Sequence, residues 1–178
     1  MMAHILPRIK GELVLPPVAH LSTSFYELNA SNEQSVLSHL DLIAGIAFAE
    51  DIRPAAYPRD LLKQAIAEGK RIRKYFRGDF YVLSNANANP RDRYVMQYHR
   101  PDEQDGMVIA FRRDRSPYIG FDAKLFGIDP SADYQATTYR TYVPETPVVL
   151  KGTALQRLRI DIHDCPGSAI VEYRKMAQ

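Results

Sequence analysis

Two adjacent carboxylates, Glu50 and Asp51, and the nearby Arg53 are residues whose types suit them to chemistry. Carboxylates can serve as general acids, general bases or nucleophiles. Adjacent residues seldom aim both carboxylates at one bond, so a self-contained catalytic pair is the weaker interpretation. The structural alternative is a solvated loop in which Arg53 pairs with the acidic residues.

Tyrosine is a second residue type that could bind a ligand. The chain has 11 tyrosines and no tryptophan, so tyrosine would supply the large aromatic surfaces. Planar aromatic faces stack on pyranose rings. The candidates for sugar stacking are Tyr94, Tyr98 and Tyr118, with Tyr134, Tyr139 and Tyr142 as a wider set. Strand tyrosines more often pack across a sheet, so the pattern alone leaves both roles open.

Other reactive patterns are missing from the sequence. None of the 5 histidines forms a His-x-x-x-His pair or stands at metal-ligand spacing with Cys165. No serine-hydrolase elbow, phosphate-binding loop or dinucleotide fingerprint occurs. The basic run Lys70–Arg77 could follow a nucleic acid, but its Ile72 and Tyr75 suit core contacts, and the net charge is only +2. We therefore expect no metal, no cofactor and no nucleic-acid partner.

Composition is that of a soluble globular protein, with 46% apolar and 25% charged residues among 178. A complete barrel of about 250 residues does not fit in this length. The single cysteine, Cys165, forms no intrachain disulfide, which agrees with a reducing compartment. The N-terminus lacks a signal-peptide core, and the longest apolar run, Leu42–Ala49, is too short to cross a membrane. We expect a cytoplasmic protein without a membrane partner, and an upstream segment would leave secretion open.

The elements that must position these residues change in kind at Arg77–Gly78. Before it, Leu42–Ala49 is typical of a strand buried on both faces, with a buried helix turn as the alternative. Residues 58–76 have helical spacing, with Pro58 suited to the first turn and Gly78 to a C-terminal cap. We expect an N-terminal segment over residues 1–77 and a second domain over residues 78–178.

The second domain alternates apolar and polar residues between turn signals. Those signals are Asn89-Pro90, Asp105-Gly106, Ser116-Pro117, Asp129-Pro130, Pro144 to Pro147, Lys151-Gly152 and Pro166-Gly167. About seven or eight short strands at this spacing predict an antiparallel β-sandwich of the Greek-key type. The fold class is α+β overall, mainly all-β, preceded by a short α/β segment.

An ordered set of short motifs resembles the C-terminal region of glycoside hydrolase family 36-type α-galactosidases, a group of retaining α-glycosidases. The motifs are Lys74–Phe76, Gly78–Tyr81, Tyr98–Pro101, Gly106–Arg113, Leu125–Pro130 with Tyr134, and Pro166–Arg174. They cover roughly residues 58 to 175 in the family's order. The resemblance implies that Leu42–Ala49 and residues 58–76 correspond to the last strand and helix of a (β/α)8 catalytic barrel.

The resemblance also implies where the chemistry lies. Enzymes of this type use two carboxylates about 5 Å apart, a nucleophile and an acid/base. In the family both stand in barrel segments that this sequence lacks, so no catalytic residue is assigned to it. At the end of a last barrel strand, Glu50, Asp51 and Arg53 would contact sugar hydroxyls.

Three functions remain open from the sequence. The first is a C-terminal fragment of an α-galactosidase-like hydrolase that supports the barrel and is inactive alone. The others are a free-standing carbohydrate-binding module and a partner-docking protein. An apolar patch around Leu42–Ala49 and Leu61–Ile72 predicts association with a barrel, encoded upstream or separately, or with a second copy.

Overall fold

The computed structural model describes residues 59–85 and 89–177. The chain divides into two compact units, residues 1–73 and residues 74–178. The predicted strand Leu42–Ala49 lies outside the described residues, as do Glu50, Asp51 and Arg53.

The helix expected over residues 58–76 is present as α4, Arg59–Ile72, followed by the 3-10 helix η2, Arg73–Arg77. Asp60 lies in the first turn of α4 and Lys70 and Arg71 in its last, so the charges complement the helix dipole. Gly78 follows the helical segment, and its N–H donates to the carbonyl of Tyr75 at 3.0 Å.

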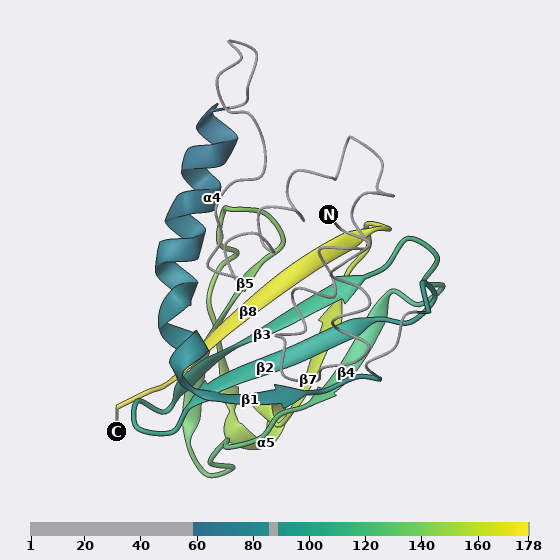
Figure 1. Cartoon of the computed structure of the whole chain (residues 1–178). Coiled ribbons are helices and arrows are strands. Elements are labelled where there is room, and N and C mark those ends of the chain that lie inside the picture. The colour runs from purple at the N-terminus through teal and green to yellow at the C-terminus, as the bar shows by residue number, and fades with distance from the viewer. Residues whose placement is uncertain (1–58, 86–88, 178) are drawn as a thin grey trace. The chain divides into compact units, whose positions relative to one another are not determined.

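Eight strands follow in the described residues, and all their pairings are antiparallel. A six-stranded sheet has the order β1-β2-β3-β8-β5-β6, and β4 pairs with β7 in a second sheet. The first four strands are β1 Asp79–Val82, β2 Tyr94–Arg100, β3 Asp105–Arg112 and β4 Gly120–Lys124. The others are β5 Asp133–Tyr139, β6 Val148–Lys151, β7 Arg157–Asp161 and β8 Gly167–Lys175, with the short helix α5, Gly152–Leu155, before β7. Figure 1 shows β1, β2, β3 and β8 side by side. The predicted, mainly antiparallel sandwich is confirmed.

The core lies between the two sheets. One face of the six-stranded sheet contributes Val95, Val108, Ala110, Ala169, Val171 and Tyr173. The smaller sheet and its flanks contribute Ala123, Leu125, Leu155, Leu158, Ile160 and Ile162. In β7, buried residues alternate with exposed or partly exposed ones, so this sheet turns a polar face outward, as the alternation predicts.

The six-stranded sheet departs from the expected alternation, because β2, β3 and β8 are buried on both faces. The face opposite the core, which we call the second face, carries large buried side chains: Tyr94, Met96, Tyr98, Met107, Ile109, Phe111 and Ile170. Near-continuous apolar runs of this kind are typical of strands in a middle layer.

One turn signal was wrong. Asp105-Gly106 begins strand β3 rather than a turn, and the reversal takes place over residues 101–104. Gln104 there has a φ of 51°, the left-handed conformation. Asp105 belongs to the strand because it pairs in register with Arg100 on β2.

Candidate functional surface

Of the three tyrosines proposed for sugar stacking, only Tyr118 presents its ring. Tyr94 and Tyr98 are 3% and 5% exposed, so in this conformation neither ring has a face open to a ligand. Burial raises the pKa of Tyr94 to about 12. Tyr118 is 62% exposed and lies in the connection between β3 and β4.

A guanidinium lies against the Tyr118 ring. The Cζ atom of Arg93 is 5.1 Å from the centroid of Tyr118 and 5.2 Å from that of Phe121. Both distances are within the range of a cation–π interaction. Arg93 is not among the residues predicted from the sequence, because no local pattern relates it to a tyrosine 25 positions later.

A buried polar network crosses the core face of the six-stranded sheet. Gln97 Nε2 donates to the Phe126 carbonyl at 2.8 Å and to the Tyr173 hydroxyl at 2.7 Å, and the Phe126 N–H donates to Gln97 Oε1 at 2.9 Å. The Tyr173 hydroxyl is 3.1 Å from Nδ1 of His99. In the sequence, the only indication of this network is that Gln97 and His99 are polar residues in an otherwise largely apolar strand.

Glycines make room for this network. A Cβ on Gly127, whose φ is +71°, would lie 2.4 Å from His99 Cδ2. A Cβ on Gly106 would lie 2.3 Å from the Tyr173 hydroxyl. His99 Nε2 is buried without a partner in the described part of the chain, and burial lowers the pKa of His99. The network has no space for a substrate, so it is a structural element of the domain.

A second cluster ties η2 to the sheet. The Tyr75 hydroxyl donates to Glu172 Oε2 on β8 at 2.9 Å. Arg100 binds both oxygens of Asp105, at 2.8 and 2.7 Å, and Asp105 is only 3% exposed. Lys74 Nζ and Arg100 Cζ lie 4.6 and 5.7 Å from the Tyr75 ring centroid. We call these residues the Tyr75 clamp. Its charged groups are paired with one another or in contact with Tyr75, so we interpret the clamp as structural and not as a reactive site.

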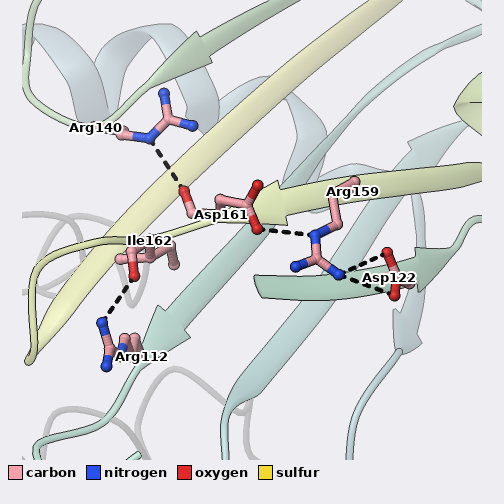
Figure 2. Close-up of polar contacts among 6 residues, drawn as sticks. All are labelled: Arg112, Asp122, Arg140, Arg159, Asp161 and Ile162. Atoms are coloured by element: carbon pink, nitrogen blue, oxygen red, sulfur yellow. Dashed lines mark hydrogen bonds and ion pairs between the residues drawn. The ribbon is translucent and has the colours of Figure 1, made fainter. Parts of the chain in front are cut away.

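The exposed face of the smaller sheet carries an ion-pair ladder (Figure 2). Arg159 on β7 donates to Asp161 at 2.8 Å and to both oxygens of Asp122 on β4 at 3.2 Å. The side chains of Asp122, Arg159 and Asp161 are 73%, 56% and 41% exposed. Exposed pairs of this kind contribute little to stability. Since Arg159 engages both carboxylates, the ladder provides no free nucleophile.

Figure 2 also shows two arginines that hold backbone carbonyls at the end of β7. Arg140 Nε donates to the Asp161 carbonyl at 3.2 Å. Arg112 Nη1 donates to the carbonyls of Ile162 and His163 at 3.1 and 2.7 Å. Arg112 Nε and Nη2 reach the Ser116 carbonyl at 3.3 and 3.2 Å, which fixes the segment before Tyr118.

An open cleft of about 820 Å³ lies near the C-terminal end of β8. Its lining consists of Glu103, Gln104, Asp129, Gln135, Arg174, Lys175, Met176 and Ala177. Hydrogen bonds from Ser131 and Lys175 hold the pKa of Asp129 well below its usual range. The lining contains no aromatic ring, so this cleft lacks the platform expected of a sugar site.

Residues 59–85 and 89–177 contain neither a candidate metal cluster nor a helix suited to crossing a membrane. No group of three or more His, Cys, Asp or Glu side chains in them is placed to hold a metal ion. None of the helices within these residues is both long enough and apolar enough to cross a membrane.

The fold is similar to part of several solved α-galactosidases. The Lactobacillus brevis enzyme aligns with a TM-score of 0.63 at 14% identity, over 84% of this chain and 22% of that one. The family 36 α-galactosidase AgaB from Geobacillus stearothermophilus aligns with a TM-score of 0.61 at 17% identity, over 83% of this chain and 20% of that one. A variant of AgaA from the same organism, in complex with raffinose, gives 0.63 at 16% identity over the same shares.

The chain spans only about a fifth of the length of these enzymes. No family model matches the sequence, and no curated protein matches it. At these identities the likeness establishes the fold. The resemblance inferred from the motifs is confirmed at that level, since the chain has the fold of a part of family 36 α-galactosidases.

Proposed function

We propose that the chain is the C-terminal region of an α-galactosidase-like glycoside hydrolase, and that its β-sandwich supports a carbohydrate-cleaving barrel. The proposal rests on how much of each chain the structural alignments cover. The three α-galactosidase structures each match more than four fifths of this chain, while the chain matches about a fifth of each enzyme. Such a match is expected for one domain of a larger enzyme.

The second face of the six-stranded sheet supports a buttressing role. Its side chains include Met96, Met107, Ile109 and Ile170, each with 0% of its surface exposed. Sheets with apolar residues on both faces occur as middle layers between other structural layers. In an intact hydrolase we expect the outer helices of the barrel to contribute to the layer on this face.

The proposal assigns no hydrolysis to this chain alone. A retaining glycosidase needs two carboxyl groups about 5 Å apart with different roles. Asp122 and Asp161 are both bound by Arg159, so they do not provide a free nucleophile and a protonated acid. Glu50, Asp51 and Arg53 remain proposed contacts for sugar hydroxyls in the intact enzyme.

Two measurements test the proposal. In the first, the purified chain is incubated with p-nitrophenyl α-galactoside, and intact AgaB serves as the positive control. We expect release of nitrophenol by AgaB and none above buffer by the chain. Turnover by the chain that is lost in the Glu50→Gln variant would show that the chain is catalytic and overturn its assignment as a support.

The second measurement sequences the coding DNA upstream of Met1 and, if needed, its neighbouring genes. We expect a barrel that carries both carboxylate segments, either in frame or in a separate gene whose product forms a complex with the chain. A stop codon upstream, together with no barrel product that binds the chain, would contradict the proposal.

A further inference from the structure

The exposed ring of Tyr118 projects from an anchored segment of the backbone. The segment that carries it is fixed on both sides by hydrogen bonds to its backbone. On one side Arg112 donates to the Ser116 carbonyl at 3.3 and 3.2 Å, and on the other the Ile162 N–H donates to the Ile119 carbonyl at 2.9 Å. Arg112 also binds the Ile162 carbonyl, so one side chain joins the two anchoring points (Figure 2). A ligand that stacks on this ring would therefore order few groups on binding.

Arg93 lies beside the ring and has one guanidinium nitrogen without an acceptor in the described residues. It is half-buried, makes cation–π contacts with Tyr118 and Phe121, and forms no ion pair with a carboxylate in the described residues. Its Nη1 atom is buried without an acceptor among those residues. A buried donor without an acceptor is costly, and in a native protein it calls for an explanation. An acceptor brought by a ligand would provide one.

We propose that Tyr118 and Arg93 form a saccharide-binding site on the surface of the sandwich. A pyranose presents a face of C–H groups and a rim of hydroxyls. The Tyr118 ring would stack on the C–H face, and the Arg93 guanidinium would donate to a hydroxyl oxygen at the rim after a small shift of the ring. The site lies entirely within residues 74–178 and is independent of any catalytic barrel.

A nucleic acid could also stack on tyrosine and bind arginine. The charge near the ring favours a saccharide over a nucleic acid. Gly120, two residues after Tyr118, pairs in register with Asp161, and Asp122 follows on the same strand. Asp122 and Asp161 share the single guanidinium of Arg159, so this group keeps one net negative charge, which disfavours a phosphate. A saccharide without charge incurs no such repulsion.

The test is native electrophoresis of the full chain in gels that contain soluble galactomannan, xylan or soluble starch, each at several concentrations. One ring and one guanidinium support weak binding, with a Kd of about 1 mM for a single sugar unit. We expect the wild-type chain to be retarded and the Tyr118→Ala variant to lose about tenfold in apparent affinity. The Tyr118→Phe variant should stay within about threefold of wild type, because it keeps the ring.

The matched control is Phe126→Ala. Phe126 is 44% exposed and its ring stacks on Tyr81 at 4.8 Å, so it is an aromatic surface pair without a cation. We expect its retardation to equal that of wild type. Melting temperatures of all variants show whether each one is folded. Because Tyr118 is exposed, its substitution should leave the melting temperature near that of wild type.

Three outcomes would overturn the saccharide site. The first is equal retardation of wild type and Tyr118→Ala. The second is no retardation of wild type by galactomannan, xylan or soluble starch. The third is a Tyr118-dependent mobility shift by single-stranded DNA and none by a polysaccharide. None of them bears on the proposed support of a barrel, which depends on the upstream coding sequence.

Discussion

Nδ1 of His99 lies 3.1 Å from the hydroxyl oxygen of Tyr173, and the two rings stack with an interplanar angle of 17°. The same hydroxyl accepts a hydrogen bond from Gln97 at 2.7 Å. Its single proton is therefore available to Nδ1 of His99. When the Tyr173 hydroxyl donates to Nδ1, His99 is the neutral imidazole with its proton on Nε2, which lies against Gly127.

This arrangement predicts acid sensitivity of the domain. Burial lowers the pKa of His99 in the folded state. The charges of Asp79, Asp105 and Asp102 and a hydrogen bond with the Asp105 backbone oppose the shift without reversing it. The unfolded chain then binds the proton more tightly than the folded one. The stabilisation from the neutral ring is complete above the unfolded pKa of about 6.5 and is lost as pH falls from there to the lowered folded-state pKa.

The measurement is the melting temperature between pH 5 and pH 8 for wild type and His99→Phe. We expect wild type to lose more stability than the variant between pH 7 and pH 5. The exposed His163 provides the control, and His163→Gln should behave as wild type. Identical pH profiles for wild type and His99→Phe would contradict the assignment.

Removal of the Tyr173 hydroxyl should destabilise the domain more than the loss of one oxygen atom suggests. In Tyr173→Phe, Gln97 loses an acceptor and His99 loses a donor, and both residues are buried. Each unsatisfied buried group costs about 1–3 kcal/mol, so we expect a loss of about 2–4 kcal/mol in urea unfolding. In a double-mutant cycle with His99→Phe, the two losses should be less than additive. Additive losses would show that the two residues act separately.

Gly127 should not tolerate a side chain. Its φ of +71° is unfavourable for alanine, and a Cβ would meet His99 Cδ2 at 2.4 Å. We expect Gly127→Ala to destabilise the domain by at least about 2 kcal/mol in urea unfolding. Asparagine adopts this backbone conformation more readily but meets the same ring, so Gly127→Asn separates strain from collision. Full stability of Gly127→Asn would show that His99 can move aside.

The Tyr75 clamp should depend on Arg100, because Asp105 is buried beside it. The Arg100 and Asp105 side chains are 20% and 5% exposed and 2.7 Å apart. In Arg100→Ala a buried carboxylate keeps only the more distant Lys74, at 3.8 Å. We expect a loss of about 2–3 kcal/mol, somewhat less than for a fully buried pair. Arg159→Ala, in the exposed ladder, is the matched control and should leave urea unfolding almost unchanged.

Local sequence determined the elements whose signals are local. Helical spacing and Gly78 predicted the helical segment α4 and η2, and alternation predicted β4 and β7. These signals suffice because helix periodicity, capping and strand alternation depend on residues a few positions apart. The sandwich class followed from the number and spacing of such strands.

Tertiary structure decided which side chains are buried and which meet. Strand β2 is buried on both faces, so Tyr94 and Tyr98 are covered while Tyr118 is exposed. The rings of Phe76 and Phe80 pack on the Tyr98 ring, each at 4.9 Å. The Asp105-Gly106 signal was read as a turn because the partner strand of Asp105 was unknown. Tyr75 meets Glu172 across 97 positions, and Arg93 meets Tyr118 across 25. The short motifs specify strands, whereas strand order specifies neighbours, and burial and contact between distant residues follow from the neighbours.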